Sequence, residues 1–307
     1  MASETSVSGK KETFSIGLVQ TACVADREHN LATAFDGVRQ AASRGAQIVC
    51  LQELFTSEYF CQREDSALFD LAEPVPGRST TAASALAKEL GIALVVPIFE
   101  RRAPGLFHNS AVVFDATGER LGMYRKMHIP DDPHFYEKFY FTPGDLGFQA
   151  FETRFARIGV LICWDQWYPE AARLTALRGA EVVFYPTAIG WLAADKNNPD
   201  EGLAQLDAWQ TIQRSHAIAN GVYVAAANRV GHEGPAAAGV DFWGRSFVCD
   251  PLGRVMVEAS AAAGDVLIAT CDRTVLENQR RGWPFLRDRR IDSYAGIDRR
   301  FLDTPWP

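Results

Sequence analysis

Three residues with chemically useful side chains lie at the ends of predicted strands: Glu53, Lys126 and Cys163. In layered α/β proteins, side chains at strand ends project from rigid backbone at the edge of a sheet, where sites form. A carboxylate, an ammonium group and a thiol at such positions can together perform nucleophilic catalysis. A strand-end glutamate can also be a simple cap or a solvated chain end, so position alone does not assign its role.

Cys163 follows an apolar, branched run, and Pro169 favours the first turn of a helix shortly after it. The thiol is therefore predicted at a strand-to-helix corner, where main-chain N–H groups are free to bind an anion. The alternative is an inert core thiol, because free cysteines are among the most buried residues.

A thiol is a weak nucleophile unless a base or a cation acts on it. A partly desolvated glutamate can be the base, which suits Glu53. Lys126 would favour the thiolate and, with the main-chain N–H of Trp164, bind the oxygen of a tetrahedral intermediate. A Cys-His pair stays open, although none of the six histidines follows a predicted strand.

Alternating strand and helix patterns predict two similar halves and hence a four-layer α-β-β-α sandwich. The first half has strands over 14–20, 47–52 and 92–99, helices over 26–45 and 79–90, and paired strands over 108–114 and 121–126. The second half has strands over 157–162, 181–185 and 222–228, helices over 169–178 and 201–220, and a β-meander over 245–249, 254–258 and 265–271.

Three stretches fall outside this repeat. Residues 127–144 predict no regular element, and a loop of that length is usually functional. Residues 1–12 are polar and predict a disordered leader before a single domain over 13–307. Residues 272–307 predict an extended, aromatic segment that packs on another subunit.

Composition excludes several classes of function. The chain has 307 residues and a net charge of −7, without a basic run of the kind that follows phosphates, so no nucleic-acid partner is expected. The arginine-rich stretch over 280–290 favours a structural or subunit contact. No run is long enough to span a bilayer. Six scattered cysteines without zinc-like spacing predict a reducing, cytoplasmic setting and no metal.

Three blocks resemble the signatures of the nitrilase (carbon-nitrogen hydrolase) superfamily: LQELF at 51–55, YRKMHIP at 124–130 and GVLICWD at 159–165. The resemblance implies the α-β-β-α sandwich and a Glu-Lys-Cys triad of Glu53, Lys126 and Cys163, with Glu137 as a second glutamate. It also implies that no cofactor is needed, and that the chain forms homo-oligomers, often through the helix over 169–178.

Within that superfamily, residues 58–62, 126–145 and 185–190 look most like N-carbamoylputrescine amidases. This resemblance implies hydrolysis of an N-carbamoyl amine to the amine, carbon dioxide and ammonia, as in polyamine biosynthesis. Those enzymes usually place a serine and an acidic residue after Gly190, where this chain has WLAAD. Either Asp195 reaches the substrate's ammonium from a rearranged loop, or the substrate has no cationic tail.

Five residues are candidates for substrate binding, each with packing or capping as the alternative: Tyr59, His134, Trp164, Thr187 and Asp195. Related substrates stay open, namely N-carbamoyl amino acids, simple amides and nitriles. A substrate with a carboxylate would need an arginine, which Arg229 or Arg245 could supply. A catalytically silent oligomeric scaffold is the alternative from another class, and the intact triad argues against it.

Overall fold

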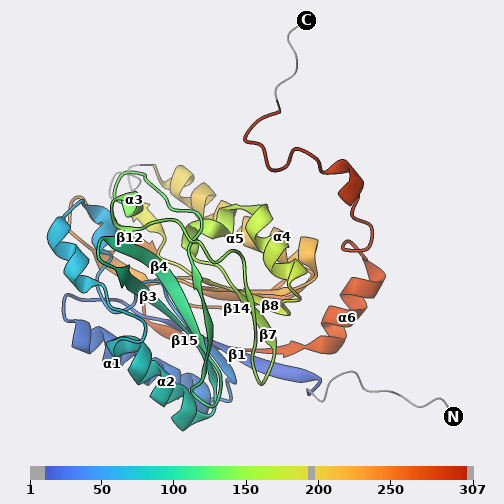
Figure 1. The fold of residues 1–307 in the computed structure, drawn as a ribbon, viewed down its shortest axis with the longest axis horizontal. Coiled ribbons are helices and arrows are strands. Elements are labelled where there is room, and N and C mark those ends of the chain that lie inside the picture. The colour runs from blue at the N-terminus through green and yellow to red at the C-terminus, as the bar shows by residue number, and fades with distance from the viewer. Residues whose placement is uncertain (1–10, 193–197, 303–307) are drawn as a thin grey trace, which may run out of the picture.

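Two six-stranded sheets lie face to face between two layers of helices (Figure 1). The computed structural model describes residues 11–192 and 198–302. The predicted four-layer sandwich is therefore confirmed. The first sheet has the order β15 (Asp265–Asp272), β1 (Thr13–Gln20), β2 (Ile48–Leu51), β3 (Ala93–Ala103), β4 (Leu106–Phe114), β5 (Arg120–Arg125). The second has the order β14 (Val255–Glu258), β13 (Phe247–Cys249), β10 (Tyr223–Ala227), β8 (Val182–Pro186), β7 (Arg157–Val160), β6 (Ala150–Glu152).

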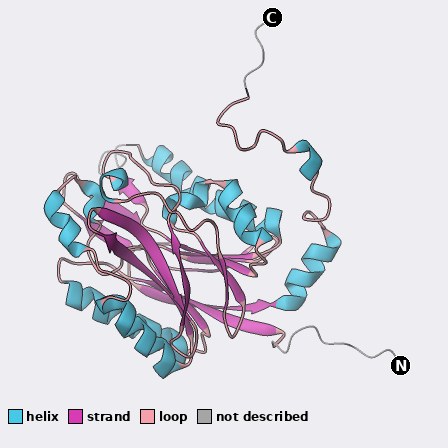
Figure 2. Cartoon of the chain, viewed as in Figure 1, coloured by secondary structure: helices cyan, strands magenta, loops and turns pink. Residues whose placement is uncertain are grey.

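Each sheet has three parallel strands at its centre: β1, β2 and β3 in the first, and β7, β8 and β10 in the second. Parallel neighbours need crossover connections, which the helices provide. These are α1 (Arg27–Ser43) and α2 (Arg78–Leu90) in the first half, and α4 (Pro169–Leu177) and α5 (Pro199–Asn220) in the second. Figure 2 shows the two helical layers on opposite outer faces.

Both faces of the first sheet are buried, which explains its continuous apolar strands. Along β2, Ile48 and Cys50 belong to the core between the sheets, whereas Val49 and Leu51 pack under α1 and α2. Asp26 caps α1 as predicted, since its side chain accepts hydrogen bonds from two amides of the first turn.

The predicted β-meander is wrong in its last strand. β13 and β14 form an antiparallel pair, but β15 leaves them and pairs with β1 of the other sheet along its whole length, from Thr13 with Asp272 to Gln20 with Asp265. An alternating pattern identifies a strand but not its neighbour, and the free edge of β1 offered the better partner.

Several short elements were missed. The loop after Lys126 contains α3 (Glu137–Tyr140), and the segment predicted to be extended begins with α6 (Arg273–Gly282), which Asp272 caps. A third sheet joins β9 (Gly190–Leu192), β11 (Val230–Glu233) and β12 (Val240–Trp243). The 3-10 helices η1 (Phe60–Gln62), η2 (Ser66–Leu71), η3 (Cys163–Trp167) and η5 (Ile291–Ser293) were also not predicted. Such elements are too short to show a period.

All six cysteines are buried and free. Within the two described ranges, no helix combines the length and the apolar character that crossing a bilayer would require.

Candidate active site

Lys126 lies between two carboxylates in the interior of the protein. Its Nζ is 2.8 Å from Oε1 of Glu53 and 2.6 Å from Oε2 of Glu137, and all three side chains are fully buried. Glu53 follows β2, Lys126 follows β5, and Glu137 begins α3. The structure thus brings together three of the residues that the sequence selected.

Glu53 is oriented by a second donor that the sequence analysis did not select. Asn109 on β4 donates its Nδ2 to Oε1 of Glu53 at 2.7 Å, and its main-chain oxygen accepts from the amide of Lys126. The other oxygen of Glu53, Oε2, is buried and has no hydrogen-bond partner among the described residues. One carboxylate oxygen is therefore held by donors, while the other is available to accept a proton.

Cys163 lies where β7 passes into η3 and then α4, as predicted for a strand-to-helix corner. Its φ of 43° is in the left-handed region, which non-glycine residues rarely adopt. The Sγ lies 3.7 Å from the main-chain oxygen of Ala188. The next residue, Trp164, contributes its amide at the start of a helical turn, where amides have no partner within the helix.

Asp165 holds this strained corner in place. Its Oδ2 accepts from the amide of Ile162 at 2.9 Å and from the Tyr124 hydroxyl at 2.8 Å. Its Oδ1 accepts from the amide of His128 at 3.0 Å and contacts that residue's ring nitrogen. Because Tyr124 and His128 flank Lys126 in sequence, Asp165 ties the cysteine corner to the lysine strand.

Arg229 holds the backbone after Glu53. Its Nη2 donates to the main-chain oxygens of Glu53 and Leu54, at 2.8 and 3.1 Å, and Leu54 has a φ of 50°. Its Nη1 pairs with Glu233, which in turn accepts from the amide of Tyr59. Both terminal nitrogens of this buried guanidinium are thus engaged in structure, whereas its Nε has no hydrogen-bond partner among the described residues.

The two carboxylates and burial set the charge of the cluster. Burial disfavours the ammonium form of Lys126, but attraction to Glu137 and Glu53 outweighs burial and raises the pKa of Lys126 well above its ordinary value. Burial raises the pKa of Glu137 to about 7, against the opposing effect of Lys126. Burial, aided by the charge of Glu53, also raises the pKa of the Cys163 thiol. The resting site therefore holds an ammonium and a neutral thiol.

A cavity of about 480 Å³ reaches Cys163 from the surface. Its described walls include Cys163 and Glu137, but neither Glu53 nor Lys126, which lie deeper. The remaining lining is mostly aromatic and aliphatic: Pro130, Pro133, Phe135, Trp164, Trp167, Ala188, Ile189, Gly190, Leu192, Ala208 and Trp243, with Asp132 and Gln205 as polar members. A small molecule can therefore reach the sulfur through an apolar passage.

The candidate binding residues are not all in this cavity. Trp164 lines it, whereas Tyr59 lies behind it and donates its hydroxyl to Oε1 of Glu137 at 2.7 Å. Thr187 is fully buried, and its hydroxyl group hydrogen-bonds to Oε1 of Gln166 and to the main-chain oxygen of Tyr185. His134 does not line the cavity, although its neighbours Pro133 and Phe135 do, and Asp195 lies outside the described residues.

Neither arginine considered for a carboxylate substrate lines the cavity. Arg229 pairs with Glu233 in the interior. Arg245 lies at the surface, where its Nη1 is 2.8 Å from Oε1 of Glu258. Sequence reasoning missed Asn109 and Asp165, and it missed the positioning role of Arg229. Asp165 lies within the GVLICWD block and Asn109 within a predicted strand. The sequence shows both residues, but it does not show which groups they hydrogen-bond to.

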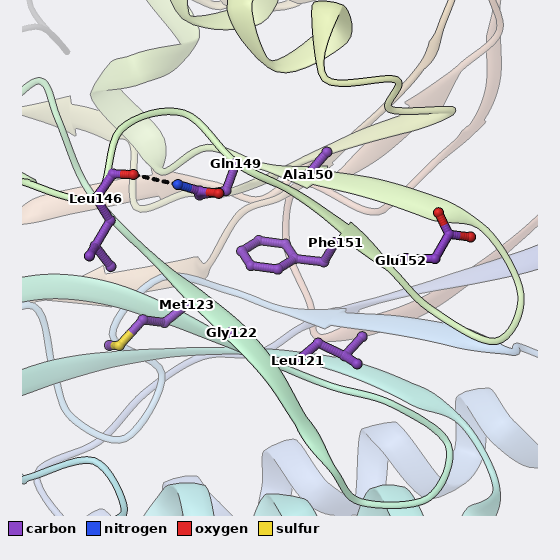
Figure 3. Close-up of a pocket in the computed structure, with 8 residues that line it drawn as sticks. All are labelled: Leu121, Gly122, Met123, Leu146, Gln149, Ala150, Phe151 and Glu152. Carbon is purple, nitrogen blue, oxygen red and sulfur yellow. Dashed lines mark hydrogen bonds between the residues drawn. The ribbon is translucent and has the colours of Figure 1, made fainter.

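A second hollow, of about 410 Å³, lies between β5 and β6 (Figure 3). Its walls are largely apolar, with Phe151 and Met123 facing it and Gln149 bonded to the main-chain oxygen of Leu146. It contains none of the residues of the catalytic cluster. Of these two cavities, only the one at Cys163 can serve the chemistry.

Known proteins resemble this chain along nearly its whole length. The pattern of the carbon-nitrogen hydrolase family matches residues 15–281. An N-carbamoylputrescine amidase from Arabidopsis thaliana is 44% identical over 293 residues, covering 93% of this chain and 95% of that protein. A citrullinase from Francisella tularensis is 39% identical over 287 residues, covering 93% and 98% respectively. The crystal structure of a carbon-nitrogen hydrolase from Helicobacter pylori G27 has a TM-score of 0.90 at 46% identity, covering 94% of this chain and 100% of that chain.

The fold and the site together define a hydrolase that acts on carbon-nitrogen bonds of small molecules. The chain belongs to the carbon-nitrogen hydrolase family. The resemblance on which the sequence analysis relied is thereby confirmed.

Proposed function

We propose that the protein hydrolyses an N-carbamoyl amine, with N-carbamoylputrescine as the leading substrate, and that Cys163 is the nucleophile. The observation that carries this proposal is the Lys126 ammonium held between Glu53 and Glu137, beside a thiol that opens into a cavity. The similarity to N-carbamoylputrescine amidases and to a citrullinase, both named for ureido substrates, supports the substrate class.

In the first half-reaction, Glu53 accepts the Cys163 proton at its free oxygen Oε2, and the thiolate attacks the carbonyl carbon. The resulting oxyanion is stabilised by the Lys126 ammonium and by the Trp164 amide. Collapse of the tetrahedral intermediate breaks the bond to the terminal nitrogen, which leaves as ammonia after Glu53 returns the proton. The product on the enzyme is a thiocarbamate ester of Cys163.

In the second half-reaction, Glu53 takes a proton from water, which attacks the same carbon. The carbon-sulfur bond breaks, Cys163 recovers a proton, and a carbamate is released that decomposes to carbon dioxide and the amine. Glu137 keeps Lys126 in place in both steps, and Tyr59 keeps Glu137 in place. No step requires a metal or an organic cofactor.

The direct test replaces the sulfur and follows both gaseous products. Cys163→Ala is expected to lower the release of ammonia from N-carbamoylputrescine by about a thousandfold or more, because no nucleophile remains. Cys61→Ala is the matched control, since Cys61 is also buried and is not assigned a role in the chemistry. Near-normal turnover by Cys163→Ala would contradict the mechanism. Release of ammonia without carbon dioxide, from amides or nitriles alone, would contradict the ureido substrate.

We propose further that the protein forms homo-oligomers in the cytoplasm. Leu174 and Leu177 are half exposed on α4, the helix that the family resemblance assigns to subunit contacts. The segment after α6 also presents large apolar side chains to solvent. Surfaces of this kind commonly mark contacts between subunits.

A further inference from the structure

The cavity at Cys163 changes in character along its length. Its inner end is formed by Cys163, Ala188 and Glu137, which are buried. Its outer end is formed by the exposed residues Asp132, Pro133 and Ala208. A substrate whose carbonyl reaches the sulfur therefore extends its other end towards this outer part of the cavity.

Charge is distributed unevenly along this passage. Among the described lining residues there are two carboxylates and no lysine, arginine or histidine. Glu137 already accepts from Lys126 and Tyr59. Asp132 makes no side-chain hydrogen bond or ion pair with another described residue, so its carboxylate is available to a ligand.

The main chain of Asp132 is held in an ordered turn. The main-chain oxygen of Asp132 accepts from the amide of Phe135 at 2.8 Å, and the two residues form an isolated β-bridge. The turn leads directly into α3, whose first residue is Glu137. Asp132 and the catalytic cluster are thus parts of one short, structured segment.

The walls between the two ends suit a hydrocarbon chain that carries a cation. Trp164, Trp167 and Trp243 line the passage, and aromatic faces favour both methylene groups and ammonium ions. We infer that Asp132 is the residue that selects a substrate with a positively charged tail, by pairing with an ammonium group at the mouth of the cavity. This inference rests on the proposed hydrolysis of N-carbamoyl amines and adds the residue that recognises the distal end.

The same arrangement disfavours substrates with a carboxylate tail. A carboxylate at the mouth would meet Asp132 without a compensating cation from the described walls, because Arg229 and Arg245 are paired elsewhere. Unpaired charge in a partly desolvated site is unfavourable. N-carbamoyl amino acids with a terminal carboxylate are therefore expected to be poor substrates.

Three ureas of similar length separate the effect of charge from the effect of shape. They are N-carbamoylputrescine with an ammonium tail, N-pentylurea with a methyl group in its place, and 5-ureidopentanoate with a carboxylate. For the unmodified protein, kcat/KM is expected to fall in that order. Hydrolysis of the first two at equal efficiency would overturn the selection by charge while leaving the proposed reaction intact. Hydrolysis of none of them would count against the proposed reaction itself.

Asp132→Asn tests the residue. The ratio of kcat/KM for N-carbamoylputrescine over N-pentylurea is expected to fall about tenfold, through KM more than kcat, because the pairing acts on bound substrate and transition state alike. Asp131→Asn is the matched control, since Asp131 is exposed and does not line the cavity. Asp132→Lys is expected to move the preference towards 5-ureidopentanoate.

Asp195→Asn tests the alternative that the sequence raised, namely that Asp195 binds the substrate's ammonium group. If this substitution lowers the ratio and Asp132→Asn does not, the assignment of Asp132 is overturned. An unchanged ratio in both variants would overturn it as well. A fall in the ratio for Asp132→Asn, with Asp131→Asn and Asp195→Asn close to the unmodified protein, is the result that supports it.

Discussion

The charge on Glu137 determines how firmly the Lys126 ammonium is held. With both carboxyls ionised, the buried group of Glu53, Lys126 and Glu137 carries one excess negative charge. Burial makes this charge costly, which is why the pKa of Glu137 rises to about 7. The proton on Glu137 is therefore gained or lost near neutral pH, where small changes in the surroundings affect it.

We predict that kcat/KM falls on the acid side with an apparent pKa near 7, because protonated Glu137 no longer holds the ammonium. The value belongs to the coupled cluster and not to one carboxyl. Glu137→Gln is expected to lower the maximum and to move this acid limb to lower pH, since one negative charge is removed. The measurement is the pH profile of ammonia release across the neutral range.

Glu258→Gln serves as the control, since Glu258 lies on the surface and pairs with Arg245. Its profile is expected to match that of the unmodified protein. An acid limb that stays in place in Glu137→Gln would show that Glu137 does not control the titration.

At the scale of elements, four described non-glycine residues have left-handed backbone, and two of them, Leu54 and Cys163, lie just after the strands β2 and β7 that lead to catalytic residues. Each of these two is held by a buried charged residue. Arg229, from a distant part of the chain, holds the first, and Asp165, two residues beyond Cys163, holds the second and links it to Tyr124 and His128. Strained conformations of this kind persist only when their surroundings fix them. The catalytic side chains are therefore positioned by long-range contacts as well as by their own strands.

Gly159 on β7 tests how closely the cysteine corner depends on its helix. A Cβ at this position would lie 2.2 Å from Cγ2 of Thr175 on α4. Gly159→Ala is therefore expected to lower the free energy of unfolding by about 2 kcal/mol and to reduce kcat, because α4 must move away from the corner. Denaturant unfolding and steady-state kinetics measure the two effects.

The matched control for Gly159→Ala is Gly282→Ala, since no atom lies within 4 Å of a Cβ at Gly282. Adding Thr175→Ser to Gly159→Ala removes the clashing methyl group. The double variant is expected to recover much of the lost stability and kcat. If Gly159→Ala were as stable as the unmodified protein, the proposed clash would be wrong.

Much of this architecture was predictable because strands and helices have different apolar periods. The strands that end at Glu53, Lys126 and Cys163 were found in this way. The β15 to β1 pairing was not, because register and neighbours depend on contacts that a pattern does not contain. Asn109 and Arg229 were missed as positioning residues for the same reason, since their partners lie on other elements. Asp132 lies in the predicted loop over 127–144, and only the structure shows that it lines the cavity at Cys163.

At the scale of the whole molecule, the chain after α6 departs from the four layers (Figure 1). It carries large apolar side chains that are mostly exposed: Trp283, Phe285, Leu286, Ile291, Ile297, Phe301 and Leu302. Ile291 is 74% exposed and Phe301 is 77% exposed, values that leave the hydrophobic surface unburied within one copy. A second copy of the chain would cover it.

Removal of residues 283–307 is expected to reduce the size of the assembly without unfolding the protomer, since this segment adds little to the core. Light scattering coupled to size exclusion gives the mass, and thermal unfolding checks the protomer. Asp298→Asn is the control, because it changes the same segment without removing apolar surface. A monomeric unmodified protein, or an unchanged mass after truncation, would contradict the subunit contact.

The pairing of β15 with β1 joins the two ends of the domain within one sheet. During synthesis, β1 is among the first strands to emerge, but its outer neighbour emerges only when the domain is almost complete. Until then β1 remains an open edge that can pair with another chain. The first sheet therefore loses this open edge only after β15, the last strand in the described part of the chain, has emerged.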